Sequence, residues 1–188
     1  IVIEGPGQRG LLAVVAAREA GAGQIIVTGT KSDTLRLSLA RELGADATVV
    51  IDDHDPVEQV IELTDGKLAD IVVDVSAFAT KPITDAIEMV RPGGKVVVAG
   101  LKSFAPIPGF ISDKLITKEI AMLGVLSSSW SSVEKSIDII RRKGDTLKKL
   151  CTHHYPVDQA DMAVKVLGRE IIDGPEAVHV HIDAASTT

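Results

Sequence analysis

This sequence contains a single cysteine and few aromatic residues, and it carries no excess of positive charge. Cys151 is the only cysteine among 188 residues, which excludes a disulfide framework and a cysteine-rich zinc site within one chain. The single thiol favours a reducing compartment, and we expect the cytoplasm. The formal net charge is -6 without a basic stripe, so nucleic acid is not expected as a partner. No apolar run reaches the length of a transmembrane helix, so no membrane partner is expected either.

The shortage of aromatic residues also constrains the core. Aromatic residues make up 3% of the chain and hydrophobic residues 45%, so the core must consist of Val, Ile, Leu and Ala. Apolar runs predict six strands, at residues 1–4, 24–28, 47–51, 71–75, 95–99 and 121–124. Helical stretches are predicted at residues 9–20, 33–43, 56–64, 82–90, 112–117 and 132–143. This alternation predicts an α/β fold with a doubly wound, six-stranded parallel sheet and helices on both faces.

The rhythm of strands and helices changes after about residue 149. Residues 152–156 predict a strand, residues 157–167 a helix, and residues 177–183 a final strand with an alternation of period two. We therefore divide the chain into a first domain, residues 1–149, and a short strand–helix–strand tail, residues 150–188. The last residues, 184–188, are expected to fray.

A glycine-rich loop joins the first predicted strand to the first predicted helix. It reads Gly5-Pro6-Gly7-Gln8-Arg9-Gly10, with the spacing G-x-G-x-x-G. Gly5 permits a tight turn, Gly7 leaves the backbone open to a phosphate, and Gly10 lets the helix pack close to the strand. The helix would direct its amino-terminal N–H groups at the anion. Because this loop lies between a strand and a helix, it predicts a dinucleotide site.

The end of the second predicted strand indicates which dinucleotide binds. NAD-binding folds of this type place an acid here to hold the ribose hydroxyls, but this strand is followed by Gly29. Gly29 leaves room for a 2′-phosphate, Lys31 offers a cation, and Thr30 and Ser32 offer hydroxyl donors. We therefore predict NADP, with NAD as the alternative. In that alternative Lys31 is a solvated lysine, and Asp33 either caps the next helix or reaches the ribose.

Six segments match motifs that occur together, in this order, in one family of enzymes. They are residues 5–13 (GPGQRGLLA), 40–46 (ARELGAD), 70–74 (DIVVD), 91–100 (RPGGKVVVAG), 118–124 (KEIAMLG) and 155–160 (YPVDQA). Together they resemble the medium-chain dehydrogenase/reductase family, of the zinc-dependent alcohol dehydrogenase type. The resemblance implies the carboxy-terminal NAD(P)-binding Rossmann domain of an enzyme that transfers hydride between nicotinamide and an alcohol or carbonyl compound. Gly29-Thr30-Lys31 is similar to the Gly-Ser-Arg of NADP-dependent members.

The resemblance also implies further cofactor contacts at the carboxyl ends of two strands. Val75 and Ser76, after the fourth predicted strand, should line the cofactor cleft. Ala99, Gly100 and Leu101, after the fifth, should lie near the nicotinamide. Ligands of open α/β sheets bind at these ends of the strands. The alternative is that these residues only pack at the end of the sheet.

The same resemblance implies parts of the enzyme that this chain does not supply. In the family an amino-terminal domain carries the catalytic zinc ligands, whereas this chain begins on the first strand, without Met, so we expect a fragment that is inactive alone. The tail would complete that absent domain. Zinc is therefore expected only in the amino-terminal domain, with no catalytic or metal-binding residue here, and the full-length enzyme is expected to be a homo-oligomer.

Several alternatives remain open on the sequence alone. The full-length protein could be a zinc-independent reductase of the same superfamily, similar to quinone reductases, or the chain could be a stand-alone dinucleotide-sensing module. An S-adenosylmethionine methyltransferase also uses a glycine-rich loop, but it needs an acid where Gly29 stands. His179 and His181 share one face of a predicted strand and could chelate a metal, although a surface histidine pair is the plainer interpretation.

Overall fold

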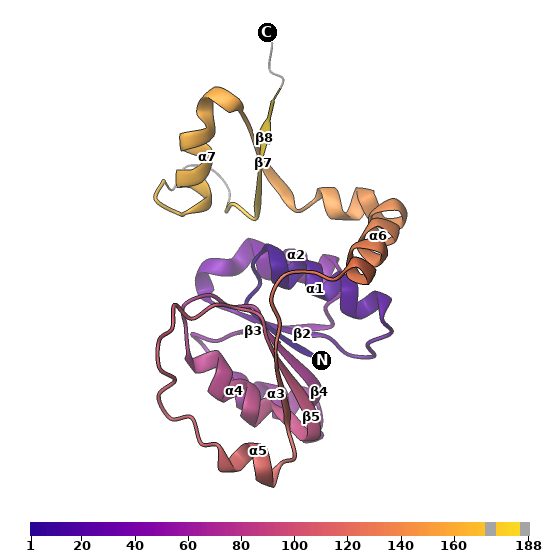
Figure 1. The fold of residues 1–188 in the computed structure, drawn as a ribbon, viewed down its shortest axis with the longest axis vertical. Helices are drawn as coiled ribbons and strands as arrows, with labels where there is room; N and C mark the ends of the chain where they lie inside the picture. Colours follow the sequence, from indigo (N-terminus) through magenta and orange to yellow (C-terminus); the bar gives the residue numbers. More distant parts are fainter. Residues whose placement is uncertain (172–175, 185–188) are drawn as a thin grey trace. The chain divides into compact units, whose positions relative to one another are not determined.

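The computed structural model describes residues 1–171 and 176–184 and forms two compact units, Ile1–Leu126 and Ser127–Thr188 (Figure 1). Most of the segment that was expected to fray, residues 185–188, lies outside the described residues. No helix within the described ranges is long and apolar enough to cross a membrane.

A six-stranded parallel sheet forms the centre of the first unit. Its strands are β1 (Val2–Glu4), β2 (Ile26–Gly29), β3 (Ala47–Val50), β4 (Ala69–Asp74), β5 (Val90–Val98) and β6 (Ala121–Gly124). They are arranged in the order β3-β2-β1-β4-β5-β6, which is the Rossmann order. The direction of the connections reverses at β1, which lies between β2 and β4. The predicted doubly wound parallel sheet is therefore confirmed.

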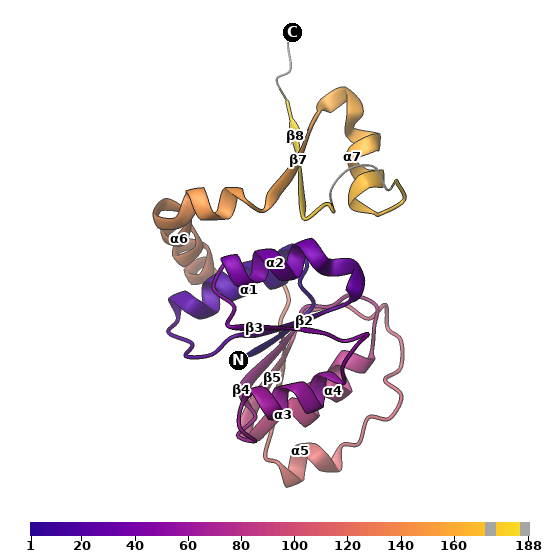
Figure 2. The same cartoon turned by 180° about the vertical axis from the view of Figure 1, so that it is seen from behind.

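Helices cover both faces of this sheet. The helices are α1 (Gln8–Glu19), α2 (Thr34–Glu42), α3 (Pro56–Leu63), α4 (Lys81–Met89) and the short α5 (Asp113–Thr117). Figures 1 and 2 show α1 and α2 on one face, and α3 and α4 on the other. A single turn of 3-10 helix, η1 (Lys31–Asp33), connects β2 to α2.

Aliphatic side chains fill the space between the sheet and the helices. Val2, Ile26, Val72 and Val96, from the four central strands, are each at most 1% exposed. Among the described residues, none of the buried hydrophobic side chains is aromatic. The composition thus predicted the kind of core correctly, because strands buried on both faces require continuous apolar runs.

Two elements differ from the sequence-based prediction. The fifth strand begins at Val90 and includes the Arg91–Gly94 turn, and its pairing with β4 shifts there from Ala69↔Val90 to Ile71↔Lys95. The last long helix, α6 (Trp130–Lys148), begins two residues before the predicted range 132–143. It kinks at Lys143, the predicted end, where the backbone is non-helical, and a further helical stretch follows. Its amino-terminal cap is Ser129, whose side chain accepts a hydrogen bond from the backbone N–H of Ser132.

The second unit contains α6 and a compact strand–helix–strand element. Its strands β7 (Cys151–Pro156) and β8 (His179–Asp183) pair in parallel. They are connected through η2 (Val157–Gln159) and α7 (Ala160–Leu167), whose Ala163 and Val166 are buried. The predicted strand, helix and strand of the tail are therefore present, although the last strand begins two residues later than expected.

Candidate functional site

The glycine-rich loop turns sharply out of β1 and into α1. Gly5 has a φ of +98°, a conformation that strains residues with a side chain, and its N–H donates to the carbonyl of Thr28 at 3.1 Å. A Cβ at Gly10 would lie only 1.9 Å from the carbonyl oxygen of Gly5. Gly5 and Gly10 are thus required by the packing of the chain itself.

Gly7 is different, because its missing side chain is not required by the protein. Gly7 caps the amino terminus of α1 with an ordinary φ of -64°, and a Cβ built there has no described heavy atom within 4 Å. Within this described helix, the first turn holds no acidic residue and no side chain caps the free N–H groups. Within the loop, the side chain of Pro6 is buried, whereas those of Gln8 and Arg9 are exposed. The loop therefore leaves an open, electropositive helix end that fits a pyrophosphate.

Pro6 explains why the last residue of β2, Gly29, is not an acid. A Cβ at Gly29 would lie 2.6 Å from Cγ of Pro6 and 3.1 Å from Cδ2 of Leu37. An aspartate at this position would collide with the glycine-rich loop. The structure thus excludes the ribose-binding acid at Gly29 by packing.

Asp33 shapes the loop that follows β2. Its carboxylate is almost fully buried and accepts hydrogen bonds from the backbone N–H of Thr30, at 2.9 Å, and from its hydroxyl, at 2.7 Å. Arg36 also pairs with Asp33, at 3.3 Å. Asp33 occupies the N-cap position of α2, but its side chain makes no capping hydrogen bond to that helix.

Lys31 is held by two acids that the sequence analysis did not single out. Its ammonium group forms an ion pair with Asp53 at 2.5 Å, and its backbone N–H donates to Asp52 at 2.7 Å. The hydrogen bond that Lys31 donates to Asp53, together with the negative charge of Asp53, raises the pKa of Lys31. These acids follow β3, which pairs with β2, so the neighbouring strand end was the signal that could have revealed them.

The residues expected after β4 and β5 lie next to one another. Ala99 and Gly100 donate their N–H groups to the carbonyl of Asp74, at 2.9 and 3.1 Å. A Cβ at Gly100 would lie 1.9 Å from the carbonyl oxygen of Ser76. Val75 donates its N–H to the carbonyl of Glu4, which immediately precedes the glycine-rich loop. The structure therefore brings the two predicted strand ends and this loop together at one edge of the sheet.

A shallow hollow marks this edge. It measures about 270 Å³, and the predicted residues Ala99, Gly100 and Leu101 line it together with Gly124, Val125 and Leu126. A larger hollow of about 410 Å³ lies at the amino ends of the strands, beside Ile1, Gly21 and Asp70. We assign the functional site to the smaller hollow and the adjoining loop, because open α/β sheets bind ligands at the carboxyl ends of their strands.

Buried charges that the sequence analysis missed lie beneath this edge. Glu4 and Asp74 are paired residues at the ends of adjacent strands, and both are buried. Burial, reinforced by the negative charge of Asp74, raises the pKa of Glu4 well above its ordinary value. Lys102 forms an ion pair with Asp74 at 2.8 Å. A charged residue at the end of a buried strand was the only sequence signal for this cluster.

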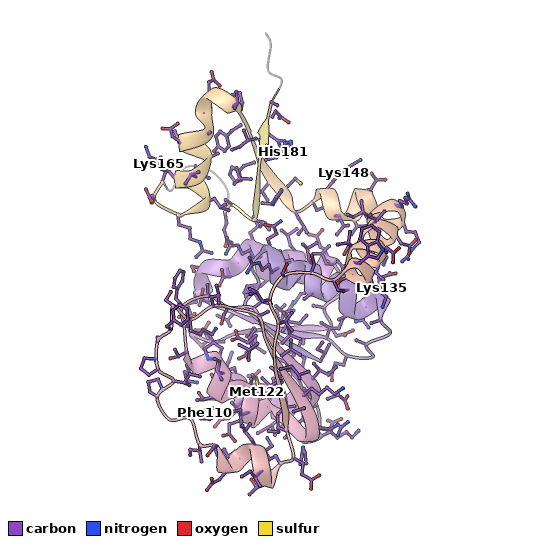
Figure 3. All side chains as sticks on the ribbon, viewed as in Figure 1. Phe110, Met122, Lys135, Lys148, Lys165 and His181 are labelled. Atoms are coloured by element: carbon purple, nitrogen blue, oxygen red, sulfur yellow. The ribbon has the colours of Figure 1, made fainter. Side chains whose placement is uncertain are left out.

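The histidines of the second unit lie on the β7–β8 pair. His154 and His181 have ring centroids 5.5 Å apart, and His181, which is labelled in Figure 3, contacts Asp183 at 2.9 Å. All three side chains are about half exposed. In residues 1–171 and 176–184, no group of three His, Cys, Asp or Glu side chains is arranged to hold a metal ion.

Comparisons with known proteins identify the family. A family model described as zinc-binding dehydrogenase matches residues 10–142. A probable alcohol dehydrogenase of Mycobacterium tuberculosis (strain H37Rv) is 42% identical over 142 residues, which cover 74% of this chain and 38% of that protein. A sorbitol dehydrogenase of Halalkalibacterium halodurans is 35% identical over 163 residues, or 87% of this chain and 47% of that protein. The crystal structure of an alcohol dehydrogenase from Thermotoga maritima has a TM-score of 0.84 at 29% identity and covers 97% of this chain and 49% of its own.

The chain thus spans about half the length, or less, of the curated relatives that it matches. These relatives are named as dehydrogenases of alcohols and of sorbitol, and are therefore oxidoreductases. The matched region runs from Gly10, the last residue of the glycine-rich loop, into α6 and includes both strand ends of the site. The chain belongs to the zinc-binding dehydrogenase family, and its first unit is the nicotinamide dinucleotide-binding domain of that family.

Proposed function

We propose that this chain is the cofactor-binding part of an oxidoreductase that transfers hydride between a nicotinamide dinucleotide and a small alcohol or carbonyl compound. The observation that carries the proposal is the open space at Gly7, at the uncapped amino terminus of α1. Packing explains Gly5 and Gly10, whereas the open space at Gly7 supports a ligand that approaches the backbone.

Each part of the site has a distinct role in this proposal. The backbone of Gly5-Pro6-Gly7-Gln8-Arg9-Gly10 binds the pyrophosphate, and the α1 amino terminus stabilises its charge. Val75 and Ser76 line the cleft that receives the cofactor. Ala99, Gly100 and Leu101 orient the nicotinamide ring at the end of β5. When bound, the dinucleotide supplies the acceptor or donor of the hydride.

We further propose that the preferred cofactor is NADP. Gly29 leaves no acid to repel a 2′-phosphate, and the carboxylate of Asp33 is engaged by Thr30 rather than directed at a ribose. Lys31 would supply the cation for a 2′-phosphate. The hydroxyl groups of Thr30 and Ser32, which are bonded to Asp33 and to each other, would exchange these partners for the phosphate. Binding exchanges Asp53 for the phosphate as the partner of the Lys31 ammonium group.

In the full-length protein, we propose that zinc assists catalysis and is held by residues outside this chain. A zinc ion bound there would polarise the oxygen of the alcohol. The 188-residue chain alone is then expected to bind the dinucleotide without oxidising alcohols. Alcohol-dependent reduction of NADP by the purified chain, well above that of the Gly7→Asp variant, would contradict this part of the proposal.

Fluorescence titration with NADPH and with NADH tests the binding site. Gly7→Asp should weaken both affinities at least about 100-fold, or about 2.7 kcal/mol, because the carboxylate occupies the phosphate position. The fold should survive, since the φ of Gly7 is ordinary and Asp is a favoured N-cap residue.

The matched control is Gly23→Asp, on an exposed loop at the opposite edge of the sheet, where a Cβ also meets no described atom within 4 Å. This control should retain the affinity of the wild-type chain. Equal binding by the Gly7→Asp variant would refute the site, and tighter binding of NADH than of NADPH would refute only the NADP preference.

A further inference from the structure

A buried lysine, Lys102, contacts Asp74 and Ser76 and is not among the proposed cofactor contacts. Lys102 follows the Ala99–Leu101 segment, and its side chain is 8% exposed. Its ammonium donates hydrogen bonds to the Ser76 carbonyl at 2.6 Å and to the Ser76 hydroxyl at 2.9 Å. It also forms an ion pair with Oδ2 of Asp74 at 2.8 Å, although that oxygen accepts no hydrogen bond. Such a buried ion pair often stabilises a fold no better than well-packed apolar residues would, so its geometry requires another explanation.

The same network fixes every polar group of Ser76. The N–H and the hydroxyl of Ser76 both donate to Oδ1 of Asp74, at 3.0 and 2.6 Å. The hydroxyl oxygen and the backbone carbonyl accept from Lys102. Ser76 can therefore move only if the buried network breaks.

Ser76 packs between Gly5 and Gly100, which lie at the two ends of the proposed cofactor site. A Cβ at Gly5 would lie 3.2 Å from both Cα and N of Ser76, and a Cβ at Gly100 would lie 1.9 Å from its carbonyl oxygen. Gly5 begins the phosphate loop, and Gly100 lies where the nicotinamide is expected. The position of Ser76 therefore sets the spacing between these two parts of the site.

We infer that Lys102 is a positioning residue for the dinucleotide, which it serves by holding Ser76 between the phosphate loop and the end of β5. This inference rests on the proposed function. A ligand that spans both parts of the site depends on their spacing, whereas a ligand that binds only the adenosine half does not. Lys102 should therefore matter for NADPH and not for 2′,5′-ADP.

The test compares these two ligands by calorimetric titration of the Lys102→Met variant of the full chain. Its affinity for NADPH should fall about tenfold, which corresponds to about 1.4 kcal/mol, and its affinity for 2′,5′-ADP should stay within about twofold. The matched control is Lys95→Met, an exposed lysine on β5, which should change neither affinity.

Lys102→Met leaves Asp74 with a buried, uncompensated negative charge, which could destabilise the fold, so a second variant removes that charge as well. The double variant Asp74→Asn with Lys102→Met removes both charges and should fold more stably than the single variant, yet still bind NADPH about tenfold more weakly than the wild-type chain.

The inference is wrong if the double variant recovers the affinity for NADPH, or if the affinities for NADPH and for 2′,5′-ADP fall equally. It is also wrong if neither variant folds. In each case Lys102 serves stability alone. A wild-type chain that binds neither ligand would overturn the proposed function as well. Wild-type binding with an unchanged affinity in both variants would overturn only the role of Lys102.

Discussion

At the scale of single residues, the glycines of the loop have two different physical causes. Gly5 and Gly10 are explained by contacts within the protein, since a Cβ at Gly10 would overlap the carbonyl of Gly5. Gly7 has no such contact, and in our proposal a bound ligand accounts for it. A sequence motif treats these glycines alike, and only the structure separates the two causes.

Glu4 gives a prediction on stability at the same scale. Burial and the charge of Asp74 raise the pKa of Glu4, so the folded chain holds this proton more tightly than the unfolded chain. Stability is therefore fully present below about pH 4.3, the ordinary glutamate value, and is lost progressively as the pH rises through the raised pKa. The isosteric variant Glu4→Gln avoids this loss because its amide does not ionise.

Denaturant unfolding from about pH 5 to about pH 9 measures the effect. The advantage of Glu4→Gln over the wild-type chain should grow with pH and then level off, with a thermal midpoint higher by a few degrees, since 1 kcal/mol shifts a chain of this size by about 2–4 °C. Glu134→Gln, at an exposed position on α6, should show no such trend. A Glu4→Gln advantage that is independent of pH would show that Glu4 ionises normally in the folded chain.

At the scale of elements, the sequence predicted the sheet better than the site beneath it. Apolar runs located all six strands because buried parallel strands are continuously hydrophobic. The Glu4–Asp74–Lys102 cluster could not be predicted, since it depends on the register of β1 and β4 and on the path of the chain after β5. The sequence does not single out the cap of α6, because Ser127, Ser128 and Ser129 all precede that helix and any of them could accept the capping hydrogen bond.

The packing of β2 against β3 carries a prediction on cofactor preference. Asp53, at the end of β3, pairs with Lys31 after β2 and places a negative charge beside the proposed 2′-phosphate position. Asp53→Asn removes that charge and frees the ammonium group, so the affinity for NADPH should rise about three- to tenfold while that for NADH changes less than about twofold.

The salt dependence of binding provides an internal check. The gain in NADPH affinity from Asp53→Asn should shrink as the ionic strength rises, because salt screens exposed charges. Asp65→Asn is a matched control on an exposed turn after α3, where asparagine tolerates the φ of 51°. Equal gains for NADPH and NADH would mean that Asp53 repels the pyrophosphate rather than discriminating at the ribose.

At the scale of the whole molecule, the described cofactor site belongs to one unit. Every proposed contact, from Gly5 to Leu101, lies in Ile1–Leu126, as do the complete sheet and its aliphatic core. The second unit has a much smaller set of buried hydrophobic residues, among them Leu150, Ala163, Val166 and Val178. Cofactor binding should therefore depend on the first unit alone.

A chain shortened to residues 1–126 tests this expectation. Its affinity for NADPH should stay within about threefold of that of the 188-residue chain, because no proposed contact and no strand of the six-stranded sheet is removed. Titration with NADPH measures the affinity, and circular dichroism establishes that the short chain folds. Gly7→Asp in the short chain should again weaken binding at least about 100-fold. A folded short chain that binds NADPH far more weakly would assign a part of the cofactor site to residues 127–188.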